Sequence, residues 1–417
     1  MRKTPLFCIL CTAAALAGPA LADGAFPAEL SVYLPPNAPS RIMLGTNFGL
    51  VLSEDGGKSW RFTCELFITN DVNDNVVYYK IASDGAVLAV TLVYLYRSSD
   101  GGCSWTRAAF SAGSLYVTDA FIDPNDPKFV VAIATTASAS QSGIYPSHDG
   151  GLSFGAALYT TSDRLIGLEI ARSAPGVIYA TQISAAGNSW LLKSTDSGAT
   201  WTPQQLQGLA PSTQPYLAAV DPDDAGKVYL RLLTYNTSTD TLAVTTDDGK
   251  TLTALGSLTG GNTFFSSFLR ANDKTVYAGT TTSDLYVQAP GQTMLSKRAG
   301  PRTRCLGQRQ GEARIYACGN MYADGFSLGT SDDQAQTFQP TMKFTDIIGP
   351  LSCPAVYNAC YSQFLLLQQT LGVGLDGGTA GNGGGKPGHC ASAGGEGTLA
   401  VLLLLAFSRS RRRMGKQ

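Results

Sequence analysis

The stretch SEDGGKSW (53–60) recurs along the chain at nearly even spacing, and this recurrence decides the fold. Four further copies keep its pattern and two are weaker: SSDGGCSW (98–105), SHDGGLSF (147–154), STDSGATW (194–201), TTDDGKTL (245–252), VQAPGQTM (287–294) and SDDQAQTF (331–338). Their third positions lie 45, 49, 47, 51, 42 and 44 residues apart. A repeat of that length, one per four-stranded blade, is typical of a β-propeller. The sequence therefore predicts an all-β fold, a seven-bladed β-propeller of four-stranded antiparallel blades.

A second recurring element precedes each of these turns and has the composition of a buried strand. Strands buried on both faces are rich in β-branched and aromatic residues, as are RIMLGT (41–46), AVLAVT (86–91), VVAIAT (130–135), VIYATQ (177–182), KVYLRL (227–232), TVYAGT (275–280) and RIYACG (314–319). The predicted order in a blade is inner strand, second strand, third strand, turn and outer strand. Four strands of ~5–6 residues with turns of ~4–6 residues give about 45 residues, which agrees with the repeat.

The aspartate of each turn has a mechanical explanation. Asp55 can accept hydrogen bonds from amides of its own turn, and Gly57 can take a positive φ without steric cost. The pattern Ser/Thr-x-Asp-x-Gly-x-Ser/Thr-aromatic resembles the Asp-box, or BNR repeat, of sialidases, photosystem assembly factors and sortilin-like receptors. The resemblance implies structural turns at the blade periphery, away from the functional face. The aspartates concerned are Asp55, Asp100, Asp149, Asp196, Asp247 and Asp333.

Bulk composition limits the classes of function. Charged residues are 15% of the chain, and the formal net charge is −1, with no basic blocks inside the repeats. This charge gives no electrostatic case for a nucleic-acid partner. His148 and His389 are the only histidines, so a Ser-His-Asp triad, a Cys-His pair or a histidine-ligated zinc site is hard to build. We therefore expect no metal and no cofactor.

Sorting segments are predicted at both ends, with the propeller between them at residues 23–371. Residues 1–22 combine a basic start, an apolar run and a small-residue site, which predicts a secretory signal peptide cleaved after Ala22. Residues 372–389 are a predicted flexible linker, because nine of the seventeen residues 372–388 are glycine.

The last segment, 390–417, contains Cys390, an apolar run at 399–407 and a cluster of arginines. The run is shorter than the roughly 20 residues of a transmembrane helix. Its positive flank is typical of a membrane stop, and a frayed hydrophobic tail is the alternative. The arrangement resembles the MYXO-CTERM and GlyGly-CTERM sorting tails of bacterial surface proteins. The resemblance implies a sorting protease, processing or lipidation at Cys390, and an exported protein at the outer membrane or cell surface, anchored or released.

Six cysteines remain in the body of the chain: Cys64, Cys103, Cys305, Cys318, Cys353 and Cys360. An even number in an exported chain favours disulfides. Cys305 and Cys318 fall on adjacent predicted strands, so a hairpin can join them. We expect Cys353 to pair with Cys360 across a short loop and Cys64 to pair with Cys103 between neighbouring blades; free buried thiols are the alternative.

The end of the ring admits several interpretations. Residues 345–353 can add an inner strand that closes the ring against residues 29–53, or they can begin a degenerate eighth blade. Residues 361–372 (YSQFLLLQQTLG) are compatible with a short amphipathic helix or with an edge strand.

Glycoside hydrolysis is the one enzymatic chemistry left open, since it needs only a pair of carboxylates. Glu169 lies on a predicted inner strand and Asp119 on the matching strand of the blade before, so both would line the central channel. Sialidases share the Asp-box, but residues 41–43 (Arg-Ile-Met) lack the proline of their Arg-Ile-Pro element, and their rings have six blades. Seven-bladed xyloglucanases pair two propellers around a cleft, whereas one is encoded here. Solvated channel groups are the simpler interpretation of both carboxylates.

Binding is the other class of function, because loops on a rigid ring suit recognition. Tyr235, Tyr322 and Phe326 lie in predicted loops, where aromatic rings can stack on sugars or anchor a protein partner. We therefore expect an exported, surface-anchored propeller that binds or scaffolds glycan or protein partners without catalysis. A glycosidase that uses Asp119 and Glu169 is the alternative.

Overall fold

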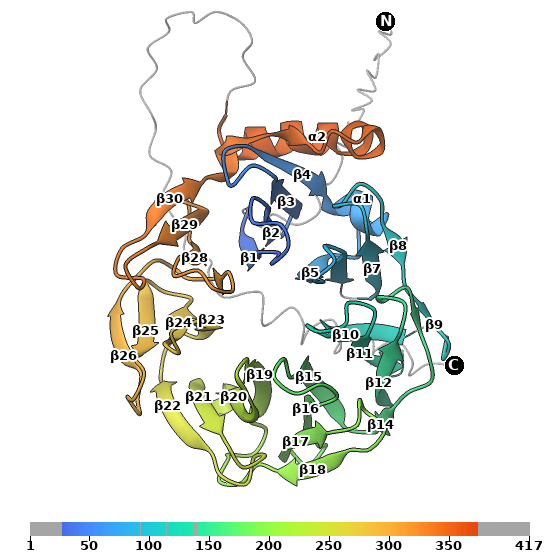
Figure 1. Ribbon diagram of the computed structural model, residues 1–417, viewed down its shortest axis with the longest axis vertical. Helices are drawn as coiled ribbons and strands as arrows, with labels where there is room; N and C mark the ends of the chain where they lie inside the picture. The colour runs from blue at the N-terminus through green and yellow to red at the C-terminus, as the bar shows by residue number, and fades with distance from the viewer. Residues whose placement is uncertain (1–26, 92, 114, 137, 139, 374–417) are drawn as a thin grey trace, which may run out of the picture.

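The computed structural model describes residues 27–373 except 92, 114, 137 and 139. The chain forms a ring of seven blades, and the first strand of each blade lies nearest the centre of the ring (Figure 1). The predicted seven-bladed propeller of four-stranded antiparallel blades is confirmed. The signal peptide with Ala22, the linker beyond residue 373 and the tail with Cys390 lie outside the described residues.

Each blade uses four strands in chain order. The first four blades contain β1 (Glu29–Tyr33), β2 (Ile42–Thr46), β3 (Gly49–Ser53) and β4 (Trp60–Cys64); β5 (Val76–Ile81), β6 (Val87–Thr91), β7 (Leu95–Ser98) and β8 (Thr106–Arg107); β10 (Leu115–Ile122), β11 (Val130–Thr136), β12 (Ser142–Ser147) and β14 (Tyr159–Thr161); and β15 (Arg164–Ile170), β16 (Ile178–Ile183), β17 (Ser189–Ser194) and β18 (Thr202–Gln205).

The remaining blades contain β19 (Gln214–Asp221), β20 (Asp224–Thr234), β21 (Thr239–Thr245) and β22 (Thr253–Leu258); β23 (Phe265–Arg270), β24 (Val276–Thr280), β25 (Asp284–Gln288) and β26 (Ser296–Ala299); and β27 (Cys305–Gln308), β28 (Ile315–Cys318), β29 (Leu328–Ser331) and β30 (Gln339–Met342). Outside the blades lie α1 (Glu65–Thr69), η1 (Tyr235–Thr237), η2 (Phe344–Asp346) and the short parallel pair β9 (Ala109–Phe110) and β13 (Ser153–Phe154).

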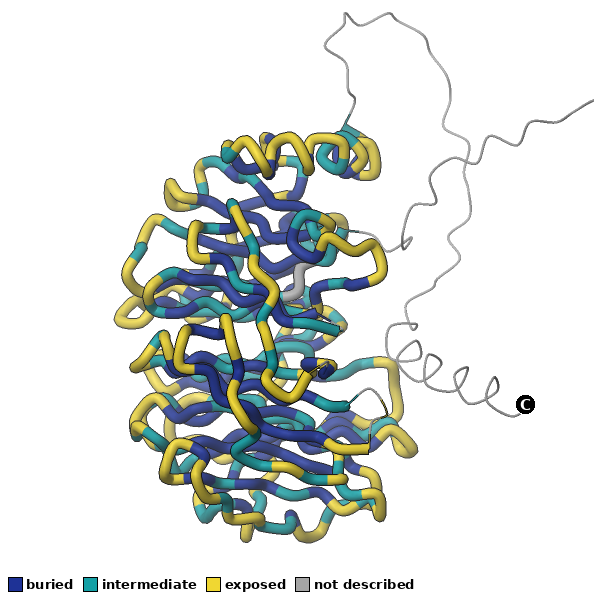
Figure 2. Tube along the Cα trace, turned by 90° about the vertical axis from the view of Figure 1, so that its right-hand side faces the viewer, coloured by how far each residue is buried: buried dark blue, intermediate teal, exposed yellow. Residues whose placement is uncertain are grey.

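The core consists of layers between neighbouring blades. Successive side chains of a strand point to opposite faces, so the second strand of each blade supplies two layers. In β11, Val130 and Ala132 pack toward blade 2, whereas Val131 and Ile133 pack toward blade 4. Figure 2 shows the resulting buried interior, with the exposed residues concentrated in the connecting loops.

The turns between third and outer strands, here called the Asp turns, hold themselves together. Asp55 accepts hydrogen bonds from the amide of Ser59 at 2.9 Å and from its hydroxyl at 2.6 Å. The indole of Trp60 donates to the carbonyl of Gly57 at 3.1 Å. These bonds from Ser59 hold the pKa of Asp55 well below its usual range. The same amide and hydroxyl bonds recur at Asp100, Asp149, Asp196, Asp247 and Asp333.

The ring closes at the rim and not at the centre. Strand β31 (Ile347–Pro350) runs parallel to β4 at the outer edge of blade 1. The predicted inner strand at 345–353 is therefore wrong, as is the eighth blade, because blade 1 already takes all four strands from residues 29–64 and leaves only its outer edge open. Helix α2 (Pro354–Thr370) follows and covers that edge (Figure 1), so most of 361–372 is helical.

Two disulfides fasten α2 to the ring. The predicted bond between Cys305 and Cys318, which face each other across β27 and β28, is confirmed. The other two predicted pairings are wrong, since Cys64 bonds Cys360 and Cys103 bonds Cys353. Seven residues of helix span about 10 Å, beyond the ~7 Å Cα limit of a disulfide, so the helix between Cys353 and Cys360 keeps them apart.

Within the described part of the chain, no helix is long and apolar enough to cross a membrane.

Candidate functional site

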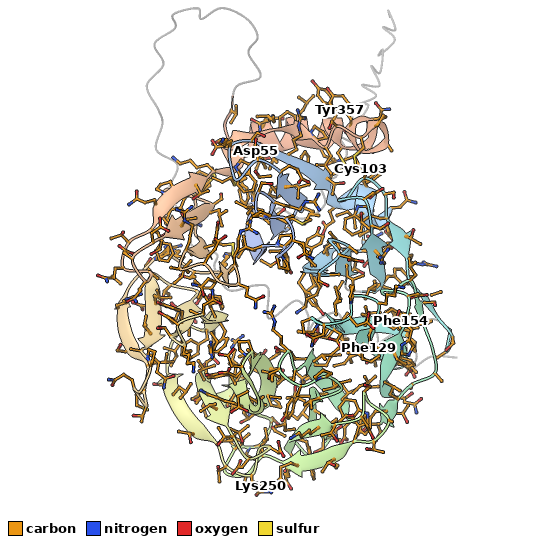
Figure 3. The ribbon with its side chains drawn as sticks, in the orientation of Figure 1. Asp55, Cys103, Phe129, Phe154, Lys250 and Tyr357 are labelled. Atoms are coloured by element: carbon orange, nitrogen blue, oxygen red, sulfur yellow. A yellow bond between two sulfur atoms is a disulfide. The ribbon has the colours of Figure 1, made fainter. Side chains whose placement is uncertain are left out.

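The inner strands place polar side chains around the centre of the ring. Asp119 lies on β10 and Glu169 on β15, the inner strands of adjacent blades, as predicted. Figure 3 shows inner-strand side chains around the central opening. We call the end at which the inner strands begin the upper mouth and the opposite end the lower mouth. Asp119 pairs with Ile133 and Glu169 with Tyr179, so Asp119 lies nearer the upper mouth.

Asp119 joins three blades. It accepts hydrogen bonds from the Tyr78 hydroxyl of blade 2 at 2.5 Å and from the Leu168 amide of blade 4 at 2.9 Å. The amide of Ala120 on its own strand donates a third, also at 2.9 Å. Burial raises the pKa of Asp119, while the charge of Lys80 and these hydrogen bonds oppose the rise. Both carboxyl oxygens are thus engaged within the protein.

Glu169 has the electrostatics of a proton donor. Burial raises its pKa to about 7, although a backbone hydrogen bond from Val220 and the charge of Lys80 oppose the rise. The negative charge of Asp119 raises the pKa of Glu169 further. A carboxyl group with this pKa holds its proton in part of the population at neutral pH, which general acid catalysis requires.

Lys80 lies on β5 in the register position that Glu169 occupies on β15. Its Nζ stands 5.4 Å from the ring centre of Tyr78 and 5.0 Å from that of Phe121. Cation–π contacts of this kind hold a lysine without neutralising it. No hydrogen bond or salt bridge ties Lys80 Nζ to another residue of the described range, so its charge acts on both carboxyl groups through space.

Similar polar bonds join other neighbouring blades. The buried carboxylate of Asp240 accepts the amide of Phe265 at 2.8 Å. Ser266 and Ser267 donate to the carbonyl of Thr303 at 2.6 and 2.9 Å. Buried backbone N–H and C=O groups need hydrogen-bond partners. These inner-strand polar side chains supply such partners to the backbone of the next blade.

The lower mouth is spanned by side chains. Arg172, which follows β15 of blade 4, donates to the side chain of Gln310 of blade 7 at 2.6 Å. Beside this contact, a cavity of about 210 Å³ is lined by residues of blades 7, 1 and 2: Val32, Tyr33, Leu34, Pro35, Pro36, Ile81, Gly307 and Gln308. Most of the residues that line it are of apolar type, and none of them carries a carboxyl group.

The three loop aromatics have different surroundings. The exposed fractions of Tyr235 and Tyr322 are 45% and 60%, so both present their rings to solvent. Phe326 is only 4% exposed, and the prediction that it is available for a partner is wrong. Its ring fills space left by Gly319 and Gly329, where an added Cβ would stand 2.6 and 2.7 Å from the ring.

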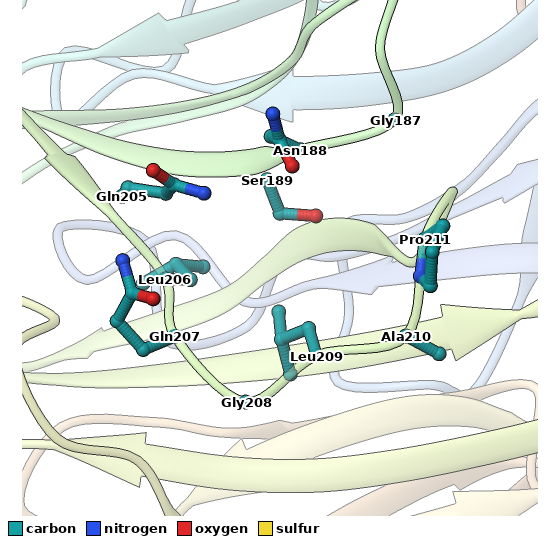
Figure 4. Close-up of a pocket in the computed structure, with 10 residues that line it drawn as sticks. All are labelled: Gly187, Asn188, Ser189, Gln205, Leu206, Gln207, Gly208, Leu209, Ala210 and Pro211. Atoms are coloured by element: carbon teal, nitrogen blue, oxygen red, sulfur yellow. The ribbon is translucent and has the colours of Figure 1, made fainter.

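A small polar pocket opens on the upper face beside blade 4 (Figure 4). Its volume is about 90 Å³, and its walls come from the loop between β16 and β17 and from the connection into blade 5. The side chains of Asn188 and Gln205 supply amide groups to it. No sequence motif marks these residues, because they come from separate loops. Among the described residues, no group of three or more metal-ligating side chains could hold an ion.

A scan against protein-family models and a search of curated proteins find no match. Solved structures with a similar fold include the extracellular domain of a protein assigned as a one component system from B. thetaiotaomicron, which is 12% identical with a TM-score of 0.53 over 76% of this chain and 42% of that chain. The Dos1 propeller is 10% identical, with a TM-score of 0.50 over 76% of this chain and 85% of its own. An ancestral GH74 enzyme is 15% identical, with a TM-score of 0.43 over 75% of this chain and 48% of its own.

These identities show the fold alone. The chain spans less than half the length of the extracellular domain and of the GH74 enzyme. Because one fold can host unrelated functions, the propeller fold by itself does not decide between binding and catalysis.

Proposed function

We propose that this chain is an exported propeller that binds a glycan or protein partner on its faces, without catalysis, and is attached to the cell surface through its C-terminal tail. Its three disulfides are typical of an oxidising compartment. The observation that carries the non-catalytic part is the engagement of Asp119 by three donors from three blades.

A glycosidase needs two carboxyl groups that face one substrate, one as acid and the other as nucleophile or base. Asp119 would have to give up hydrogen bonds to Tyr78 and Leu168, which connect blade 3 to its two neighbours. Removing the acceptor from buried donors costs about 1–3 kcal/mol per group. This cost favours a fixed, structural Asp119 and leaves Glu169 without a carboxylate partner.

The glycosidase alternative rests on a single favourable observation, the pKa of about 7 at Glu169. That value suits a general acid, and Lys80 nearby could stabilise a developing negative charge. In the binding account, the same pKa follows from burial of a carboxyl group at the centre of a rigid ring.

The proposal is tested on the full-length, oxidised chain with a glycan array and with an affinity screen of surface proteins. We expect selective retention of one glycan class or one protein ligand, unchanged when Glu169 is replaced by glutamine. Release of new reducing ends from the bound glycan by the wild-type chain, abolished in Glu169→Gln, would contradict the non-catalytic role. No ligand in either screen would overturn the binding function itself.

A further inference from the structure

Four side chains at the upper mouth form no hydrogen bond or salt bridge between blades within the described residues. We call them the mouth group: Arg164, Tyr216, Arg231 and Tyr235. They come from β15 of blade 4, from β19 and β20 of blade 5, and from η1, which directly follows β20. The hydroxyl oxygens of Tyr216 and Tyr235 lie 3.4 Å apart. The guanidinium of Arg231 stands 5.6 Å from the ring centre of Tyr216. Two phenols and a guanidinium therefore meet beside the central opening.

Both arginines of the mouth group have N–H groups that are available to a ligand. Arg231 uses its Nε to donate to both carboxyl oxygens of Asp240 at 3.0 Å, and that buried carboxylate holds the guanidinium in place. Within the described residues, the two terminal amino groups of Arg231 have no hydrogen-bond partner. Arg164 is exposed at the start of β15 and has no hydrogen bond or salt bridge to a described residue.

Arg164 and Tyr216 occupy the same register position on the adjacent inner strands β15 and β19, one residue before the register shift of each strand. The positive charges of Arg164 and Arg231 both act on the Tyr216 hydroxyl. Burial raises the pKa of Tyr216, and the neighbouring Tyr235 hydroxyl adds to the rise, while Arg164 and Arg231 oppose it. An arginine lowers the pKa of a phenol only when its positive charge lies close enough to favour the phenolate. The two positive charges would attract an anionic group of a ligand in the same way, although burial keeps the phenol itself neutral.

The carboxylates of this region are already occupied. Asp240 is fully buried and accepts the Phe265 amide as well as Arg231. Asp163 accepts the amide of Gln182 at 2.9 Å, and Gln182 in turn accepts the Tyr159 hydroxyl. Both carboxylates are hydrogen-bonded to donors of the protein, whereas the guanidinium of Arg164 and the terminal amino groups of Arg231 have no partner among the described residues.

The mouth group adjoins the polar pocket of Figure 4. Ser189, in the pocket wall, donates to the carbonyl of Thr213 at 2.5 Å. The Thr213 and Thr234 hydroxyl oxygens lie 2.7 Å apart, and Thr234 directly precedes Tyr235. A chain of hydrogen bonds thus connects the wall of the pocket to the residue before Tyr235, and the pocket lies next to the mouth group.

We infer that the mouth group and the adjoining pocket bind a carboxylate-bearing sugar. Arginine donors match a carboxylate, the exposed ring of Tyr235 offers a face to a pyranose ring, and the amides of Asn188 and Gln205 suit sugar hydroxyls. The inference rests on the binding function proposed above and names the ligand class for it. Uronic acids and sialic acids share this chemistry.

The test compares sugars that differ only in the acid group. Methyl β-glucuronide and methyl β-glucoside share one ring, and the methyl glycoside of N-acetylneuraminic acid represents the second acid source. Binding to the full-length, oxidised chain is measured by saturation-transfer NMR and calorimetry. We expect one of the acidic sugars to bind while the glucoside does not, and we expect the affinity to fall as salt rises.

Variants locate the site. Arg164→Gln should weaken binding of the acidic sugar roughly 10- to 100-fold, the value of a charge-assisted hydrogen bond. Arg172→Gln, at the lower mouth, is the matched control and should leave affinity unchanged. Arg164 is exposed, so its replacement should not alter the melting temperature.

Equal binding of the glucoside and the glucuronide would overturn the inference. An acidic sugar that binds Arg164→Gln as tightly as the wild type would also overturn it. A neutral glycan or a protein that binds elsewhere would also overturn it, while leaving the proposed binding function standing. Absence of any ligand in the array and the protein screen would instead refute the binding function.

Discussion

The two disulfides that hold α2 should stabilise the ring in a coupled way. Cys64–Cys360 and Cys103–Cys353 link residues 296 and 250 positions apart, and both attach the same helix. A disulfide stabilises mainly by restricting the unfolded chain, and more so for longer loops. While one bridge is intact, however, the other closes only the loop made of 64–103 and 353–360, about 46 residues.

The chain-entropy relation gives the expected magnitudes. The double replacement Cys103→Ala and Cys353→Ala should cost about 4 kcal/mol, because Cys64–Cys360 still confines the chain. Removal of both α2 bridges should cost about 9–10 kcal/mol, more than twice that figure, because the second loss opens the full ring. Removal of Cys305–Cys318, separated by 13 residues, is the matched control and should cost about 3 kcal/mol.

The assay is unfolding in urea and by heat, followed by tryptophan fluorescence, on the wild type and the three variants. A loss of 4 kcal/mol in a domain of this size corresponds to a fall of roughly 5–6 °C in melting temperature. A variant lacking both α2 bridges that unfolds no more easily than the Cys305–Cys318 control would refute the reasoning. So would additivity of the two α2 bridges, since the shared loop predicts an excess of about 1.5 kcal/mol.

Three further outcomes follow from single residues. Burial alone would raise the pKa of Asp149, but hydrogen bonds within its turn lower that pKa to about 2. The turn should therefore add its full share to the free energy of unfolding above about pH 4 and lose it as the pH falls toward 2. Asp149→Asn should abolish this pH dependence of stability in acid titrations. The pKa of Glu169, about 7, exceeds the ordinary 4.5, so the protein should be most stable below about pH 4.5 and lose stability as the pH rises to 7. Glu169→Gln should be more stable than wild type at pH 8 by up to ~3 kcal/mol in urea unfolding. Equal stability of the two at pH 8 would contradict this expectation. Gly49→Ala should cost more than about 3 kcal/mol or prevent folding, because its Cβ would stand 2.0 Å from the Thr63 carbonyl oxygen, whereas Gly56→Ala meets open space and should cost about 1 kcal/mol.

The blade pattern could be predicted from sequence because it is local. The second strands are buried on both faces, so runs such as 86–91 and 275–280 fall within one residue of β6 and β24. The Asp turns form their hydrogen bonds within about five residues, so a stretch of eight residues is enough to predict them.

Ring closure and the disulfides could not be predicted, because they depend on contacts between distant segments. The pattern of 361–372 supports helix and strand equally, and contacts with distant residues place that segment on the rim. These contacts are the disulfides of Cys353 and Cys360 and the packing of α2 against β4. Once α2 is helical, the short-range pairing of these cysteines is geometrically excluded.

The strands that carry the two candidate carboxylates could be predicted, but the contacts of these carboxylates could not. Asp119 and Glu169 lie on inner strands as expected, yet the hydrogen bond from the Leu168 amide to Asp119 joins two blades and has no sequence signal. Of the mouth group, only Tyr235 was identified, from its loop position. Arg164 and Tyr216 belong to different strands, and nothing in the sequence indicates that their blades bring them together.

The most direct test of the central claim measures hydrolysis and binding together. The full-length, oxidised wild type is compared with Glu169→Gln and with the double variant Asp119→Asn and Glu169→Gln, on the glycan that the array retains. The account predicts equal retention of the glycan by the wild type and Glu169→Gln, and no new reducing ends from any of the three. Turnover by the wild type that disappears in Glu169→Gln, with the glycan still bound, would contradict it and assign the centre of the ring to catalysis.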